Sequence, residues 1–290
     1  MSIRQILTSR RSLTIAVSMA GLLSLALGAH AALNKRAPEL SRPDVVATGS
    51  IGEQANKISR VALVIGNGHY PDENAPLLQP INDARALTTA LRRDGFDVEV
   101  VEDASRDDMQ RAVERLKAKI RPGSVAMLFF GGFGIQAGRE SYMIPVDAAI
   151  WNERDVRRHG VSIESVLDAM KERGAKAKVA VIDASRRNPF ERRFRTYSHG
   201  LAPINAPGNS LILTAATPGQ VVGDTDAQNS RLVGELLGNL DAGGVSAETV
   251  FSRTRAAVSR ASNGEQIPSV SSSLTDDLSF GRNARAASAQ

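Results

Sequence analysis

Short apolar segments alternate with amphipathic segments along most of this chain. Four continuous apolar runs, bounded by glycine or polar residues, are typical of central strands covered on both faces. They lie at residues 60–67, 125–130, 179–183 and 210–215. Residues 96–101 instead alternate between apolar and polar positions, which predicts a strand with one wetter face.

Between these strands, apolar residues recur at the three- and four-residue spacing of amphipathic helices. The helical segments begin near residues 80, 107, 162, 230 and 247. Asn82 or Asp83 is a plausible N-cap for the first helix, and Gly95 ends it. Residues 278–280 are expected to add a last edge strand. This alternation predicts an α/β fold, a three-layer α/β/α sandwich with a mostly parallel central sheet.

Polar loops follow three of the predicted strands, at residues 67–70, 131–134 and 184–187. The carboxyl ends of parallel strands share one edge of a sheet, and open α/β sheets place their ligand crevices there. Ser185 lies at such a strand end and is followed by a basic loop. A functional site is therefore expected on this edge, with Ser185 at its centre.

The first 31 residues resemble an export signal. A basic start precedes an apolar run, small residues surround a cleavage point at residues 29–31, and Arg10 and Arg11 resemble a twin-arginine signal. We expect cleavage and a periplasmic or secreted protein; an uncleaved membrane anchor is the alternative, and it would be the only membrane contact. Residues 32–58 have the composition of a linker, residues 59–281 of one folded domain, and residues 282–290 of a disordered tail.

Composition excludes several kinds of chemistry. The cysteine count is 0, which excludes disulfides, thiolate nucleophiles and metal sites built on thiolates. The four histidines show no ligand spacing, so neither a metal nor another cofactor is expected. Three leader arginines, Arg4, Arg10 and Arg11, account for part of the formal charge of +5, which leaves +2 in the mature chain. With aromatic residues at 4%, nucleic acid is not an expected partner.

Several segments together resemble the caspase-like domain of bacterial peptidases in the caspase–metacaspase family, peptidase C14. They occur in family order across nearly the whole domain. The matching pieces are residues 61–67 with Tyr70, 80–84, 95–98, 142–147, 183–190, 200–202, 215–219 and 229–230. The resemblance implies the caspase-like fold and, for active members, cysteine-type endopeptidase activity.

Both catalytic positions of that family are replaced in this chain. The resemblance places the family's histidine base at Phe133 and its cysteine nucleophile at Ser185. A serine hydroxyl is nearly inert unless a base takes its proton, and phenylalanine accepts none. Positioned acid–base help is worth about 10²–10⁴ in rate, so the replacement is a serious loss.

Other family positions leave alternatives open. Gly132 and Gly134 match glycines whose turn offers a backbone N–H to an oxyanion; the alternative is a tight turn in which Phe133 fills an empty pocket. Asp183 matches an aspartate that helps to accept a substrate arginine or lysine, or it only organises its loop. The arginines at 186, 187, 192, 193 and 195 either attract an acidic partner or form a solvated loop.

The sequence therefore indicates an exported caspase-fold pseudopeptidase that binds a peptide or protein, with Asp183 as an anchor for a basic side chain. The alternative is a weak serine-type hydrolase with Ser185 as nucleophile and a recruited base. His69 is the candidate base, because it follows the first strand and is expected on the same edge.

Overall fold

The computed structural model describes residues 58–71, 76–187, 190, 200–223, 225–241 and 244–281. All of them lie within residues 54–290, one of the two units into which the chain divides. The predicted leader, the predicted tail and all but the last residue of the predicted linker lie outside the described residues.

A six-stranded sheet forms the centre of the domain, in the order β2-β1-β3-β7-β8-β9. The first five of these strands run parallel and β9 runs antiparallel, which confirms the predicted mostly parallel sheet. Both faces of β3 and β7 are buried, as their unbroken apolar sequences require. The strands are β1 (Arg60–Gly66), β2 (Asp97–Glu102), β3 (Val125–Gly131), β7 (Ala177–Asp183), β8 (Ser210–Thr214) and β9 (Ser269–Ser272).

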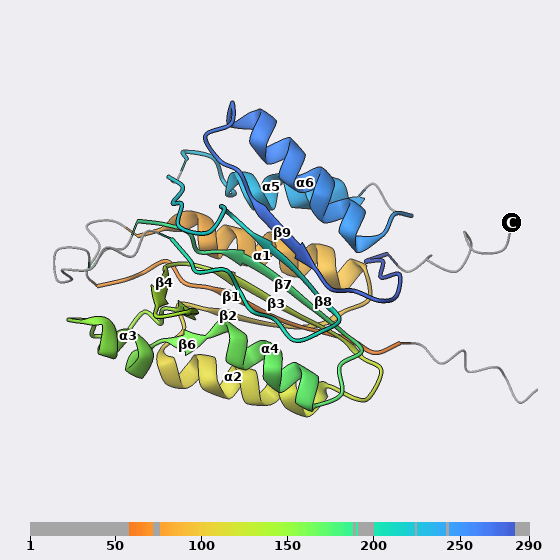
Figure 1. Cartoon of the computed structure of the whole chain (residues 1–290), viewed down its shortest axis with the longest axis horizontal. Coiled ribbons are helices and arrows are strands. Elements are labelled where there is room, and N and C mark those ends of the chain that lie inside the picture. Colours follow the sequence, from red (N-terminus) through yellow and green to blue (C-terminus); the bar gives the residue numbers. More distant parts are fainter. Residues whose placement is uncertain are drawn as a thin grey trace, which may run out of the picture. The chain divides into compact units, whose positions relative to one another are not determined.

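Helices cover both faces of this sheet and complete the predicted three layers (Figure 1). One face packs against α1 (Leu78–Arg93), α5 (Arg231–Asp241) and α6 (Ala247–Ala261). The other packs against α2 (Arg106–Lys119) and α4 (Ile163–Glu172). Among the helices of the described part of the chain, none is both long and apolar enough to span a membrane.

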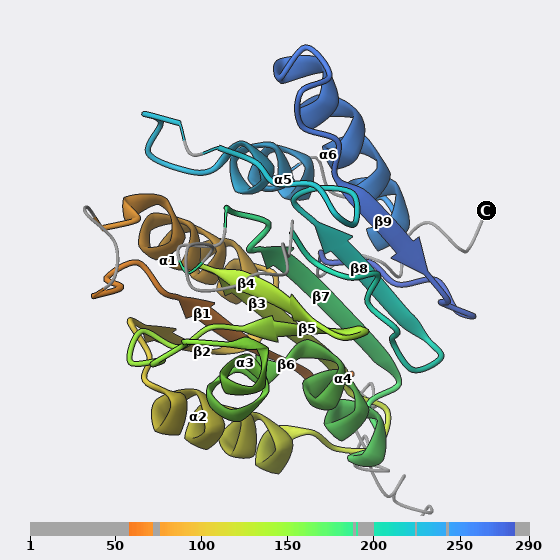
Figure 2. The same ribbon diagram turned by 60° about the vertical axis from the view of Figure 1, so that its left-hand side comes forward.

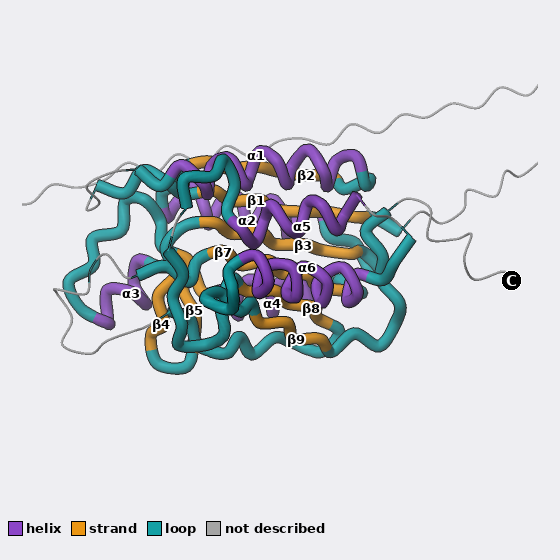
Figure 3. Tube along the Cα trace, turned by 90° about the horizontal axis from the view of Figure 1, so that it is seen from above, coloured by secondary structure: helices purple, strands orange, loops and turns teal. Residues whose placement is uncertain are grey.

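A second, three-stranded sheet was not predicted. It consists of the antiparallel strands β4 (Gly134–Ala137), β5 (Glu140–Met143) and β6 (Val161–Ser162), next to the short helix α3 (Glu153–His159). Figure 2 shows this sheet beside the main one, and Figure 3 shows it with α3 gathered at one end of the main sheet. Its strands have two to four residues, too few for a clear periodic pattern.

The predicted start of the first helix is wrong. Helix α1 begins at Leu78, and its N-cap residue Leu77 makes no side-chain capping bond. Pro80 falls in the first turn, where its missing N–H costs nothing, so the helix extends back through it. Neither Asn82 nor Asp83 caps this helix. Both instead form hydrogen bonds with the segment that leads into α5.

The predicted edge strand at residues 278–280 is also wrong, because β9 at Ser269–Ser272 takes the edge beside β8. The final segment returns to the core instead. Phe280 is 3% exposed and stacks on Phe251 of α6 with ring centroids 5.8 Å apart. Its carbonyl accepts a hydrogen bond from Arg60 at the start of β1. The last described residues therefore fasten α6 and β1 together.

We predict that Phe280→Ala lowers the free energy of unfolding by about 3 kcal/mol, because truncating a buried phenylalanine removes apolar contact and leaves a cavity. Urea unfolding of the variant and the parent measures the difference. Ile267→Ala is the matched control, since Ile267 is 42% exposed and its truncation is expected to cost less than about 1 kcal/mol. Equal losses in the two variants would contradict a core role for Phe280.

Candidate functional site

The carboxyl ends of β1, β3 and β7 lie side by side, as the sequence predicted. Gly131, the last residue of β3, is in register with Asp183, the last residue of β7. Backbone hydrogen bonds continue beyond this point: Gly132 N–H donates to the Asp183 carbonyl at 3.3 Å, and Gly134 N–H to the Ala184 carbonyl at 2.9 Å. The turn after β3 is thus fastened along the start of the loop after β7.

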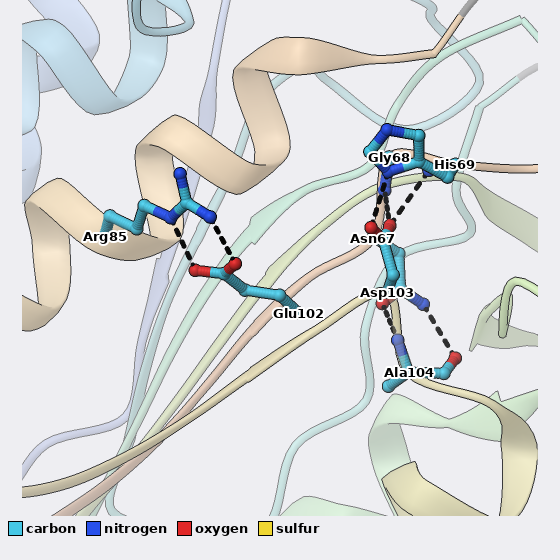
Figure 4. A network of polar contacts seen from close by, with 7 residues as sticks. All are labelled: Asn67, Gly68, His69, Arg85, Glu102, Asp103 and Ala104. Carbon is cyan, nitrogen blue, oxygen red and sulfur yellow. Dashed lines mark hydrogen bonds and ion pairs between the residues drawn. The ribbon is translucent and has the colours of Figure 1, made fainter.

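A buried asparagine organises the loop after β1. The Oδ1 atom of Asn67 accepts from Ala104 N–H at 2.8 Å, and its Nδ2 donates to the carbonyl of Ile144 at 3.2 Å. Its backbone N–H donates to the Gly131 carbonyl at 2.9 Å. One side chain therefore joins the segments that follow β1, β2 and β5. Figure 4 shows its contact with Ala104. The sequence placed Asn67 on this edge but did not predict that role.

Ser185, the residue at the predicted nucleophile position, is enclosed. It is 1% exposed, and its Oγ has no hydrogen-bond partner among the described residues. Its carbonyl accepts from Val222 N–H at 2.7 Å, which holds the loop after β8 against it. A serine hydroxyl becomes a useful nucleophile when an adjacent base takes its proton. Ser185 makes no such contact in this structure.

Phe133, at the predicted base position, belongs to an aromatic cluster. Its ring meets that of Tyr70 edge-on, with centroids 4.7 Å apart and planes at 64°. The Tyr70 hydroxyl donates to the Ile144 carbonyl at 2.9 Å and accepts from Phe133 N–H at 3.1 Å. Burial raises the pKa of Tyr70 well above its usual value, so this hydroxyl stays protonated. The cluster supplies packing and no general base.

The turn at residues 131–134 has no amide left for an oxyanion. The N–H groups of Gly132 and Gly134 donate to the loop after β7, and that of Phe133 to Tyr70. A Cβ at position 132 would lie 2.6 Å from Tyr70 Oη, and one at 134 would lie 2.9 Å from Ala184 Cβ. The glycines therefore permit close packing of these two loops. These contacts are those of a tight turn with a packed Phe133.

His69 is bound to a carboxylate on the outer part of the edge (Figure 4). Its Nδ1 lies 2.5 Å from Asp103 Oδ2, and its side chain is 61% exposed. Asp103 Oδ1 accepts from the N–H groups of Gly68 and His69 at 2.8 and 2.9 Å. Burial opposes the charge of Asp103, but these hydrogen bonds hold the pKa of its carboxyl below the usual value. The structure does not bring His69 to the Oγ of Ser185.

Asp183 lies against an internal cation. Its Oδ1 is 3.7 Å from Nη1 of Arg186, and both side chains are almost fully buried. The same Nη1 donates to the carbonyls of Asp183 at 2.5 Å and Gly132 at 3.1 Å. Asp183 Oδ2 has no hydrogen-bond partner among the described residues. One oxygen of this carboxylate is therefore balanced by Arg186, and the other makes no hydrogen bond.

A second buried carboxylate, Asp83, lies near Asp183, although its place in the sequence predicted an N-cap. Asp83 is 0% exposed and accepts from Asn229 Nδ2 at 2.8 Å and Ser230 N–H at 3.0 Å. Burial, together with the charge of Asp183, raises the pKa of Asp83 to about 7. The sequence signal was its spacing: Asp83 falls four residues before Leu87, on the face of α1 that is otherwise apolar.

A small polar cavity of about 10 Å³ adjoins Asp183, the space of about one water molecule. The segment after β8 covers it and is held by Gln79 of α1. Gln79 Nε2 donates to the Thr225 carbonyl at 2.6 Å, the Thr225 hydroxyl at 2.9 Å and the Ala227 carbonyl at 3.0 Å. Polar groups on its wall come from Gln79, Asp183, Arg186, Ser230, Arg231 and Gln266.

The predicted basic run is only partly described. Arg186 is buried and Arg187 is exposed, so these two neighbours do not form one solvated surface. Arg192, Arg193 and Arg195 lie outside the described residues. Within the described ranges, no three histidine or carboxylate side chains come together as metal ligands.

The pKa of Asp83 predicts a stability that falls as pH rises. The folded chain binds this proton more tightly than the unfolded chain, where an aspartate has a pKa of about 3.9, so stability is lost from about pH 4 to pH 7. Asp83→Asn keeps an acceptor for Ser230 N–H and removes the ionisation. We expect the variant to be more stable than the parent at about pH 8 by roughly 1–4 kcal/mol, and similar to it near pH 4.

Urea unfolding across this pH range measures the effect. Asp168→Asn, at an exposed position on α4, is the control and is expected to follow the parent at every pH. A difference between Asp83→Asn and the parent that does not change with pH would contradict the prediction.

Comparison with known proteins identifies the family. A family model described as the caspase domain matches residues 59–279. Two proteins are 29% identical to this chain over 133 residues: mucosa-associated lymphoid tissue lymphoma translocation protein 1 of Homo sapiens, and its homolog of Mus musculus. The match covers 46% of this chain and 16% of each relative, so the similarity concerns a small part of those longer proteins. Because the family model extends from before β1 to beyond β9, the chain belongs to the caspase domain family, peptidase C14.

Proposed function

We propose that this caspase-domain protein binds a peptide or protein segment without cleaving it. The observation that carries the proposal is the state of the reaction centre. The chain has 0 cysteines, Ser185 is enclosed with no hydrogen-bonded base among the described residues, and Phe133 packs against Tyr70. The amides of the turn beside Phe133 are engaged with other groups. Nucleophile, base and oxyanion donor are then all missing from a centre that keeps the family's fold.

The ligand we propose carries an arginine or lysine side chain. Asp183 lines the cavity, and the buried Asp83 lies behind its wall, bonded to the lining residue Ser230. A guanidinium is well suited to pair with carboxylate oxygens. Asp183 Oδ2 makes no hydrogen bond to a described residue, which supports its use by a ligand. The cavity is smaller than a guanidinium, so binding requires the covering contacts between Gln79 and Thr225 to open.

We predict that arginyl peptides selected from a random library bind the full chain, and that Asp183→Asn weakens them about tenfold or more, because a charge-assisted contact is lost. Citrulline in place of arginine keeps the shape of the side chain without its charge and is expected to weaken binding similarly. Fluorescence anisotropy measures both changes. Equal affinity of the arginyl and citrullinyl peptides would contradict recognition of a cation.

The same peptides test the absence of cleavage. Prolonged incubation with arginyl, lysyl and aspartyl peptides, followed by mass spectrometry, is expected to show intact peptide. Fragments that disappear in Ser185→Ala would overturn the proposal and favour the serine-hydrolase alternative with His69 or another group as base.

We also propose that the protein is exported, on the basis of the signal-like pattern in residues 1–31. Expressed in a bacterium with an intact twin-arginine system, the mature chain is predicted to begin at Ala32 and to lie outside the cytoplasm. N-terminal sequencing of the fractionated protein measures this. Arg10→Lys with Arg11→Lys is expected to leave the precursor uncleaved. Cleavage in the double variant would contradict the twin-arginine route, and cytoplasmic parent protein would contradict export.

A further inference from the structure

The cavity beside Asp183 holds more buried negative charge than buried positive charge. Asp183 lines it directly, and Asp83 lies immediately behind its wall, since it accepts a hydrogen bond from Ser230, another lining residue. Arg186 is the one almost fully buried cation among the described residues that line this cavity, and its Nη1 is committed to Asp183 and Gly132. One carboxylate on the cavity wall and one behind it are thus accompanied by one almost fully buried cation among the described lining residues.

The groups around Asp83 supply no second counter-ion of equal burial. From the segment leading into α5, its partners are the neutral Asn229 and Ser230, and from β7 the nearby group is the like-charged Asp183. Arg231, at the start of α5, lines the cavity but is only partly buried and donates to Gln266 Oε1 at 3.3 Å. On α1 itself, Gln79 is neutral and bonded to Thr225. Burial and the charge of Asp183 raise the pKa of Asp83 to about 7, and its protonation would remove the excess charge.

We propose that a guanidinium or ammonium side chain entering this cavity displaces one proton from Asp83 to solvent. The inference rests on the proposed function, because it describes how that same site accepts its ligand. The neutral carboxyl of Asp83 becomes a carboxylate, its proton passes to water, and the ligand cation takes over the balancing charge. No covalent bond to the ligand forms or breaks.

The exchange gives the site a pH dependence with a definite sign. Burial and the charge of Asp183 raise the pKa of Asp83 toward neutrality, so the free protein carries this proton in mildly acidic solution. Ligand affinity then rises with pH, by up to about tenfold for each pH unit while Asp83 is protonated, and levels off once the free protein has lost the proton. The same proton favours the closed, ligand-free state at low pH.

Calorimetry of the full chain with N-acetylarginine amide as the probe tests the exchange. Titrations at about pH 5.5 in two buffers of different ionisation enthalpy give the number of protons released per ligand bound. We expect about one proton at that pH and close to none at about pH 8.5, with affinity at least tenfold higher at the higher pH.

Variants separate this inference from the function on which it rests. Asp83→Asn is expected to bind the probe weakly at both pH values and to release no proton, whereas exposed Asp168→Asn behaves as the parent. If the parent binds the probe without releasing a proton, and Asp183→Asn does not bind it, the proton exchange alone is overturned. If the parent binds neither the probe nor N-acetylcitrulline amide at any pH, the cation site itself is overturned.

Discussion

The attachment of the turn after β3 to the end of β7 is the interaction on which the rest of the site depends. Two backbone hydrogen bonds, from Gly132 and Gly134, and the side chain of Arg186 bind the two loops together. At position 134 the close approach needs glycine, because a Cβ there would collide with Leu201 and Ala184, whereas a Cβ at 132 would collide with Tyr70 in the loop after β1. The close approach also consumes the amides that an oxyanion would need. The contact that joins the two loops thus also occupies the N–H groups of Gly132 and Gly134.

Much of the fold could be predicted because its central strands contain unbroken runs of apolar residues. Four apolar runs and one alternating segment predicted the five parallel strands and their common edge, and helical spacing predicted the helices between them. The small sheet could not be predicted, since its strands have two to four residues and pack against α2, α3 and α4, which are distant contacts that no short pattern records. Residues 278–280 were wrongly predicted to form a strand, because an apolar residue suits either a buried loop or a strand. Phe280 packs on Phe251 from a loop.

The position of the site could be predicted from the sequence, but its hydrogen bonds and its buried carboxylates could not. The strand ends predicted that Ser185, Phe133 and Asp183 lie together. No sequence pattern predicts that the N–H of Phe133 donates to the Tyr70 hydroxyl. The role of Asp83 in the site was not predicted, because an aspartate near a predicted helix start is typical of an N-cap. Helix α1 in fact begins at Leu78, five residues before Asp83. With the boundary corrected, the same residue falls on the apolar face of α1. Its unusual position then becomes the signal.

The positions that replace the catalytic pair and the carboxylates beside them affect the fold in opposite ways. Phe133 stabilises the domain, since a buried ring packed edge-on against Tyr70 contributes both apolar contact and a favourable ring geometry. Asp83 and Asp183 do the reverse, because buried ionic groups lose their hydration, and apolar residues of similar size in their place are often neutral or stabilising by about 1–4 kcal/mol. Packing therefore accounts for Phe133 and gives no reason for one buried carboxylate on the cavity wall and another behind it. A ligand cation that joins Arg186 as their counter-charge supplies that reason, which is why the proposed function is assigned to the cavity and not to Ser185.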